Sequence, residues 1–280
     1  MARVAGIAAE TAPREPGAAL RALLAAGWAV ARAAPIVLLA LGWEALAMSG
    51  AVTPFQLPRL SAVLARIWTD AVAGDLVLNT ALTLYRALVG FAIAAMAGVV
   101  LGMAMSRNVA VRWLFDPIVS VGFPMPKIAF LPVIILWLSV YDTSKIVMVV
   151  MDAIFPVVTA TVAGIAGVDR HLLWSARNMG ASERAVLWQI VLPAALPQIM
   201  TGLQVALPIA LIVAVLAEML MGGYGLGGAM VHASRFADSR GVFAGIVEIA
   251  VVGYVVVKAM ALVRRRLLIW HQEALAPSTV

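Results

Sequence analysis

Long apolar segments separated by short polar stretches dominate this 280-residue chain. Several of these segments reach the roughly 17–25 residues that a helix needs to cross a bilayer. The pattern therefore predicts an all-α, polytopic membrane helical bundle of about six transmembrane helices. The expected spans cover residues 33–48 (with Trp28 as an alternative start), 84–105, 118–140, 145–165, 202–221 and 242–263.

The segment between the first two spans has a weaker, one-sided apolar pattern. Leu60, Val63 and Ile67 recur at helical spacing, and Arg66 and Asp70 are interspersed among them. A helix with one apolar face and a polar remainder lies in the membrane interface. We therefore predict an interfacial amphipathic helix here.

Composition supports the membrane class and narrows the possible partners. Hydrophobic residues make up 64% and charged residues 12% of the chain, and the mean hydropathy is +1.01. The net charge of +6 does not indicate nucleic-acid binding, because the basic residues flank the apolar segments and do not alternate with exposed aromatic residues. The absence of cysteine excludes disulfides, thiol nucleophiles and cysteine metal sites.

The basic residues predict the orientation, since cytoplasmic loops carry an excess of Lys and Arg. With both termini inside, twelve arginines lie on the cytoplasmic side and five basic residues on the outer side. We therefore predict a cytoplasmic N-terminal tail at 1–32, a membrane domain at 33–263 and a cytoplasmic C-terminal tail at 264–280. The same orientation places the semi-polar stretch 169–197 in the cytoplasm.

That cytoplasmic stretch is longer than a simple loop, and its residues predict a helical elbow at the membrane surface. Gly180 favours the left-handed conformation that ends a helix. Ser182 is a typical N-cap, and Glu183 suits the positive end of the following helix dipole. Pro193 and Pro197 are expected to mark the exit toward the next span.

Prolines interrupt the third, fourth and fifth expected spans. Each removes a backbone donor that must be compensated inside the bundle or by water, as in helices that line transport pathways. The alternative is that they are ordinary prolines of membrane helices. Gly98 and Gly102 form a G-x-x-x-G pair that predicts close helix packing. The candidate pathway or helix-break prolines are Pro124, Pro126, Pro132, Pro156 and Pro208.

Glu218 is the ionisable residue within a span that we connect most readily with function. A carboxylate inside the membrane must be paired or face water. Glu218 is therefore either a pathway residue or a paired structural carboxylate, and the same alternatives apply to Glu248, Asp152 and Lys127. The Lys258 side chain is expected to extend to the cytoplasmic interface.

The sequence lacks the residues of a phosphate-binding loop, a metal site or a catalytic site. The glycine-rich run 221–228 has no lysine of a phosphate-binding loop, and it predicts a re-entrant turn or loop outside the membrane. His171, His232 and His271 are isolated, so no metal site is predicted. A membrane-embedded enzyme would need a convergent catalytic set, but H-E-x-x-H and G-x-S-x-G are absent. An ATP-independent channel or secondary transporter is a further alternative, although no inverted repeat is apparent.

The spacing of Gly180, Ile190, Leu192 and Pro193 resembles the cytoplasmic "EAA" loop of permease subunits from binding-protein-dependent ABC importers. Further blocks similar to the nitrate, sulfonate and taurine subgroup extend over residues 57–270. They include LTLYRALVGFAIA, DPIVSVGFPMPKIAFLPVIILWL and AEMLMGGYGLG.

The resemblance implies a type I ABC importer permease fold with cytoplasmic coupling helices, in the bacterial inner membrane. Such a subunit is not an enzyme but forms the translocation pathway. The resemblance favours an aliphatic sulfonate, taurine or a nitrate-like anion as the transported solute, with bicarbonate or a pyrimidine precursor as alternatives. The implied partners are a cytoplasmic ABC ATPase dimer, an extracytoplasmic solute-binding protein and a second permease copy, in a homodimer. The chain has no G-x-x-x-x-G-K-[ST] loop, so ATP-Mg would be bound by the partner ATPase and no cofactor by this chain.

The resemblance also implies that the elbow couples the permease to the ATPase. Trp174 and Ser175 stand at the places of the family's Glu and first Ala, and only Ala176 is retained. This departure puts the ionic contact of that Glu in question and leaves apolar docking, with Arg177, Glu183 and Arg184 as alternative polar contacts. The implied coupling residues are Trp174, Ser175, Ala176, Arg177, Gly180, Ala181, Ser182, Glu183, Ile190, Leu192 and Pro193.

Overall fold

The computed structural model describes residues 34–269, and these fall into two compact units that divide between Ala62 and Val63. The predicted N-terminal tail at 1–32 and most of the predicted C-terminal tail lie outside the described residues. Within the described residues every regular element is helical and no strand occurs. The prediction of an all-α chain is therefore confirmed for this part.

The first unit contains one described helix, Ala34–Met48, within the first expected span. Its chain returns after the helix, where the Trp43 indole Nε1 donates to the Pro58 carbonyl at 2.9 Å. The Ser61 hydroxyl donates to Glu44 Oε1 at 2.8 Å. At about 1.5 Å per residue, the described helix is shorter than a bilayer core of about 30 Å. The alternative start at Trp28 lies outside the described residues.

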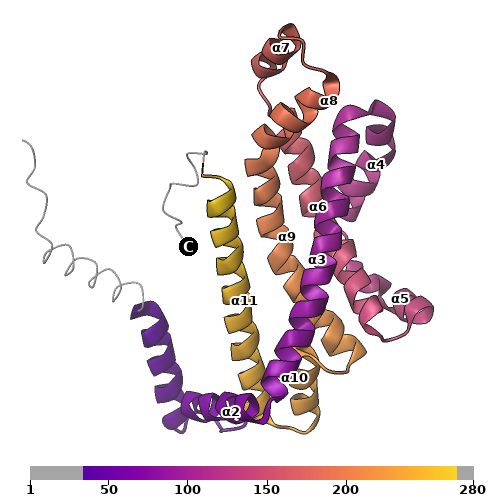
Figure 1. Ribbon diagram of the computed structural model, residues 1–280. Coiled ribbons are helices and arrows are strands. Elements are labelled where there is room, and N and C mark those ends of the chain that lie inside the picture. Colours follow the sequence, from indigo (N-terminus) through magenta and orange to yellow (C-terminus); the bar gives the residue numbers. More distant parts are fainter. Residues whose placement is uncertain (1–33, 270–280) are drawn as a thin grey trace, which may run out of the picture. The chain divides into compact units, whose positions relative to one another are not determined.

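The second unit is a bundle of long helices with short connecting elements (Figure 1). Its elements, in chain order, are α2 (Leu60–Ala73, from Val63 onward in this unit), α3 (Asp75–Arg107), α4 (Val109–Gly122), η1 (Lys127–Phe130), α5 (Leu131–Leu138), α6 (Asp142–Ala166), α7 (Arg170–Asn178), α8 (Glu183–Val186), η2 (Leu187–Val191), α9 (Leu192–Met221), α10 (Leu226–Arg235) and α11 (Ser239–Leu267).

Four helical segments among the described residues are long and apolar enough to cross a membrane, and the bent α4–α5 segment makes a fifth if it counts as one span. Helices α3, α6, α9 and α11 correspond to the second, fourth, fifth and sixth predicted spans. The amphipathic α2 also forms as predicted, with Val63 buried, Trp68 71% exposed and an Arg66–Asp70 ion pair at 2.8 Å. The membrane class is confirmed, and the number of spans is four or five within this part of the chain.

The third predicted span is interrupted, and the predicted helix break at Pro124 and Pro126 is confirmed. Helices α4 and η1–α5 meet at an angle of 96° around the turn that contains Pro124 and Pro126. Pro132 does not break a helix, because it lies in the first turn of α5, where a missing N–H costs no helical bond. Pro156 and Pro208 likewise lie inside the unbroken helices α6 and α9.

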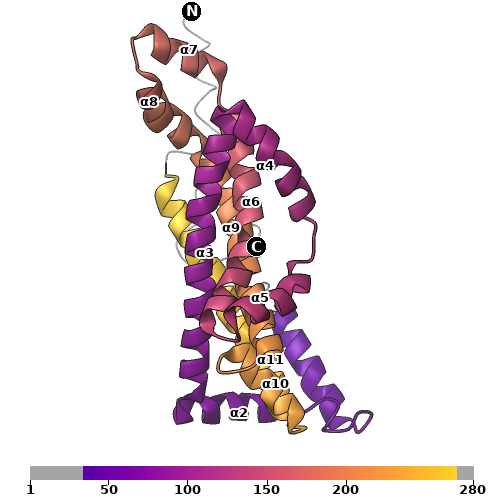
Figure 2. The same cartoon turned by 90° about the vertical axis from the view of Figure 1, so that its right-hand side faces the viewer.

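Helices α3, α6 and α9 lie side by side in both views and form the core of the unit (Figures 1 and 2). Fully buried Met148, Val149 and Val157 of α6 pack there against Ala206 and Ala210 of α9. Helix–helix packing in a membrane depends on close van der Waals contact, because lipid is as apolar as the side chains. Small residues at the helix crossings are therefore expected.

Glycines set the distances between these helices. A Cβ on Gly98 would lie 2.8 Å from Val157 Cβ, and one on Gly102 would lie 2.6 Å from Thr161 Cβ. The predicted role of this pair in packing is confirmed. On α9, a Cβ on Gly202 would lie 2.4 Å from the Ala160 Cβ of α6. Helix α6 is thus contacted on two sides by glycines, those of α3 on one side and that of α9 on the other.

Candidate functional site

The predicted elbow lies beyond the amino end of α9 and begins with α7 (Figures 1 and 2). The Asp169 carboxylate caps this helix by accepting from the His171 N–H at 2.8 Å. At its end the Ala181 N–H donates to the Ala176 carbonyl at 3.1 Å, and the Gly180 N–H donates to the Arg177 carbonyl at 3.0 Å. These two bonds define a Schellman motif, which requires a left-handed residue.

Gly180 supplies that residue with φ of +82°, and the predicted helix end is confirmed. Ser182 then caps the next helix as predicted, since its hydroxyl accepts from the Ala185 N–H at 3.3 Å. The elbow therefore consists of α7, a glycine turn and α8. Its shape depends on local signals in the sequence.

The exit from the elbow differs from the prediction. Pro193 and Pro197 are predicted to mark the exit toward the next span, and in the structure this exit has no gap, because α8, η2 and α9 follow one another directly. The segment η2 is a π-helical turn in which the Leu192 N–H donates to the Leu187 carbonyl five residues earlier. This wider turn keeps the preceding carbonyls away from the Pro193 ring, which would clash in a regular α-helix. Pro193 itself occupies the first turn of α9.

A small apolar core holds the elbow against α9. Ala176 of α7 is 2% exposed and Val186 of α8 is 3% exposed, and they cluster with Val191, Ala195 and Ile199. The partly buried coupling residues Ala181, Ile190 and Leu192 pack against the same cluster. Movement of α7 or α8 is consequently coupled to the amino end of α9.

The outer surface of the elbow carries the other predicted coupling residues. Trp174 is 55% exposed, and its indole meets the His171 ring edge-on at 5.4 Å between centroids. Ser175 and Pro193 are also exposed. Arg177 and Glu183 form an ion pair across the glycine turn, with Arg177 Nε 2.8 Å from Glu183 Oε1. The hydrogen bond from Arg177 lowers the pKa of the exposed Glu183 carboxyl below its usual value.

Glu218 lies near the opposite end of α9 and is fully buried. Its carboxylate accepts from Arg86 Nη1 at 2.6 Å, from the Thr83 hydroxyl at 2.8 Å and from the Gly227 N–H at 3.1 Å. The structure thus places it in a saturated network of donors, as a paired carboxylate requires. Its role in a pathway stays a prediction.

Arg86 is the residue of this network that the sequence reasoning missed. Only 4% of its side chain is exposed, and it binds Glu218, Asp142 and the Tyr224 carbonyl. The sequence does show that Arg86 places a guanidinium inside an apolar span, and such a group requires a buried partner of opposite charge. Sequence alone did not identify that partner, because Glu218 lies 132 positions away.

The glycine-rich run connects α9 to α10 by a tight turn that rests on this network. Gly222, Gly223 and Gly225 have positive φ angles. A Cβ on Gly225 would lie 2.3 Å from the carboxyl carbon of Glu218, so only glycine fits there. The Gly225 N–H donates to Asn79 Oδ1 at 2.8 Å. The predicted turn is confirmed.

The remaining membrane charges also have specific surroundings. Lys127 lies 3.0 Å from Asp152 Oδ1 and donates to the Phe123 carbonyl at 2.9 Å. Its ammonium also lies 4.6 Å from the centre of the Phe155 ring. These contacts fix the bend between α4 and α5 against α6. Lys127 and Asp152 therefore form a structural pair in this part of the chain.

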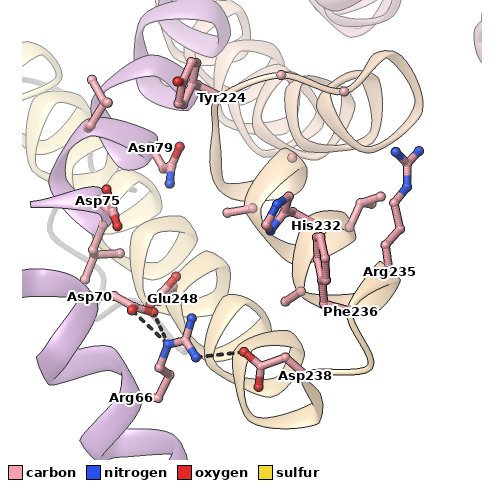
Figure 3. Close-up of a pocket in the computed structure, with 18 residues that line it drawn as sticks. Arg66, Asp70, Asp75, Asn79, Tyr224, His232, Arg235, Phe236, Asp238 and Glu248 are labelled. Atoms are coloured by element: carbon pink, nitrogen blue, oxygen red, sulfur yellow. Dashed lines mark hydrogen bonds and ion pairs between the residues drawn. The ribbon is translucent and has the colours of Figure 1, made fainter. Parts of the chain in front are cut away.

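A cavity of about 680 Å³ opens near the same end of the bundle, between α2, α3, α10 and α11 (Figure 3). Arg66 crosses one side of it, with Nη1 2.7 Å from Asp238 Oδ2 and Nε 2.8 Å from Asp70 Oδ1. Glu248 lies beside this pair in Figure 3, and its buried Oε1 has no hydrogen-bond partner. None of the candidate pathway prolines lines this cavity.

The comparisons with known proteins agree with this architecture. Residues 90–269 match the family model "Binding-protein-dependent transport system inner membrane component". The taurine transport system permease protein TauC of Escherichia coli K12 is 32% identical over 236 residues, which is 82% of this chain and 86% of that protein. The putative aliphatic sulfonates transport permease protein SsuC of Bacillus subtilis 168 is 30% identical, over 88% of this chain and 89% of that protein.

Two further matches extend the comparison. The nitrate import permease protein NrtB of Leptolyngbya laminosa is 30% identical over 62% of each chain. Among solved structures, a chain of the inward-facing MetNI methionine ABC transporter matches with a TM-score of 0.57 and 19% identity, over 70% of this chain and 95% of that chain. This likeness shows the fold, that of a type I ABC importer permease. The chain belongs to the family of inner-membrane permease components of binding-protein-dependent transport systems.

Proposed function

We propose that this permease forms the membrane path for a small sulfonate, taurine or nitrate-like solute, and that the elbow couples the path to a separate ATPase. The names of the related proteins support the solute class, since they act on taurine, aliphatic sulfonates and nitrate. One structural observation supports the coupling most directly. The elbow continues through η2 into α9, a 30-residue helix of the buried core.

In the proposed cycle, two ATPase subunits close on ATP-Mg and move the elbow. The buried contacts of Ala176 and Val186 transmit this movement to α9, and the glycine crossings transmit it to α6 and α3. The path then alternates between inward-open and outward-open states, as in other domain-coupled switches. An extracytoplasmic solute-binding protein delivers the solute, and this chain performs no hydrolysis itself.

We also propose that two copies of the chain enclose the path, with both termini in the cytoplasm. Large apolar side chains on α4 and α5 support a second copy, because Trp113, Leu136 and Trp137 are each at least 76% exposed in the single chain. A patch of this kind must meet lipid or protein. The excess of arginines at the elbow and in the tails supports the orientation.

Co-purification of the tagged chain from its native cells in a mild detergent tests the proposal. Recovery of an ATPase and a solute-binding protein supports the importer. The complex is then reconstituted in vesicles with the binding protein, and ATP-driven uptake of labelled taurine, an alkanesulfonate and nitrate is measured. ATP-independent uptake, or a folded chain without an ATPase partner, would instead favour the channel or secondary transporter. A membrane-embedded enzyme would show turnover by the chain alone.

A further inference from the structure

The outward face of α7 combines an exposed indole with basic side chains. With about 100° per residue, Trp174 lies about 200° around the helix from buried Ala176, so it points away from the elbow core. Arg170 and Arg177 precede and follow Trp174 by one turn and share its face. This face holds no carboxylate of its own.

The ion pair across the glycine turn limits what the charged residues of the elbow offer to a partner. Both groups are directed at each other, since Arg177 Nε and Nη2 donate to Glu183 Oε1 and Oε2 at 2.8 and 3.2 Å. Glu183 therefore neutralises Arg177 within the elbow and is itself engaged. Contacts of both residues to the ATPase stay a prediction; in the structure the two side chains pair with each other across the turn between α7 and α8.

We propose that Trp174 is the anchor that determines which ATPase this permease accepts, and that the partner offers an uncharged apolar slot bordered by acidic side chains. This inference rests on the elbow docking proposed above. An exposed tryptophan loses unfavourable contact with water when it enters such a slot, and tryptophan is enriched among residues that dominate binding energy. Arg177 is neutralised by Glu183, but Arg170, one turn before Trp174, complements an acidic border and would repel a basic one.

The proposed apolar slot differs in chemistry from the basic slot that docking through an ionic contact would require. A basic slot is suited to a carboxylate at position 174, as in the motif that the sequence resembles. An apolar slot with an acidic border would exclude that carboxylate, because burying an unpaired charge is costly and like charges repel. Trp174→Glu therefore has opposite expected effects in the two cases.

The test measures binding of the detergent-solubilised permease to the purified ATPase that is recovered with the wild-type chain. We expect Trp174→Ala to weaken binding at least tenfold, at about 1.4 kcal/mol per tenfold change. Trp174→Phe should bind within about threefold of wild type, because it keeps an aromatic ring in the slot. Trp174→Glu should bind at least as weakly as Trp174→Ala. The control is Trp68→Ala, which removes another exposed indole, on α2 and outside the elbow.

Each outcome has a defined meaning. All variants should keep the wild-type melting temperature, because the indole is exposed and makes no core contact. Unchanged binding by Trp174→Ala, or binding by Trp174→Glu as tight as wild type, overturns the anchor while leaving the elbow docking intact. Failure of the wild-type chain to bind the ATPase contradicts the proposed function itself.

Discussion

Replacement of Arg86 by alanine should destabilise the permease more than most single substitutions. The variant leaves Glu218, which is 0% exposed, with the Thr83 hydroxyl and the Gly227 N–H as its remaining donors among the described residues. It also removes the donor to the Tyr224 carbonyl. Removing one partner of a buried ion pair costs about 3–5 kcal/mol, because the other charge remains buried. At about 2–4 °C per kcal/mol for chains of comparable size, the melting temperature should fall by on the order of 10 °C.

The assay is thermal unfolding of the purified protein in detergent, followed by tryptophan fluorescence and by retention of the monodisperse peak. The double variant Arg86→Met with Glu218→Gln removes both charges while keeping the shape of the site. It should recover at least half of the lost stability, since neutral replacements of a buried pair are often tolerated. Arg177→Ala is the control, because an exposed pair contributes little. A change of less than about 2 °C for Arg86→Ala, or no recovery in the double variant, would refute the reasoning.

Three further predictions concern the crossings and the elbow. Gly202→Ala should destabilise by about 1–3 kcal/mol, measured by the same unfolding assay, because its Cβ would lie 2.4 Å from Ala160 Cβ. Gly180→Val should uncouple transport from ATP hydrolysis in reconstituted complexes while membrane insertion stays normal, because a β-branched residue is strained at φ of +82°. Finally, the lowered pKa of Glu183 means that its pairing with Arg177 is complete at neutral pH and is lost only as the pH falls below the ordinary value of 4.5. Protease cleavage at the elbow should therefore be constant near neutral pH and accelerate only in that acidic range.

Each of these predictions has a matched control. Gly42→Ala places the same methyl group on a helical glycine with no atom within 4 Å, so it should leave the melting temperature unchanged or raise it. Gly180→Asn should retain coupling, because asparagine adopts the left-handed conformation at low cost. If the Gly180→Val complex has the same substrate-stimulated ATPase activity as wild type, the result would count against the coupling role of the elbow. For Glu183→Gln, cleavage should be faster and independent of pH; a profile like that of wild type would contradict the ion pair.

The sequence was most informative where structure depends on neighbours along the chain. The glycine turn at Gly180 and the cap at Ser182 arise from signals within a few residues, and both form as predicted. The long helices α6 and α11 also lie close to their predicted spans, because twenty or so apolar residues leave few alternatives in a membrane. Family resemblance extended these local signals to the whole fold.

The parts that escaped prediction depend on residues far apart in sequence. Pro124 and Pro126 predict the break between α4 and α5, but the pairing of Lys127 with Asp152 of α6 that holds the bend is not evident from the sequence. The continuation of α8 into α9 across Pro193 needs a π-helical turn, whereas proline rules predict an end. Glu218 stood out as a buried carboxylate, but the Arg86 that pairs with it became evident only in three dimensions.

The glycine contacts of α6 with α3 and α9 have a mechanical consequence. Backbones that touch through glycine have no long side chains between them to bend, so the three helices resist sliding and rotate as one lever. Helix α9 has 30 residues, about 45 Å at about 1.5 Å per residue. A rotation of about 5° about its elbow end would then displace its far end, with Glu218 and the glycine turn, by about 4 Å. That distance is comparable to the diameter of a nitrate or sulfonate group, so under the proposed function a rotation of only a few degrees at the elbow would be enough to gate the path at the far end of α9.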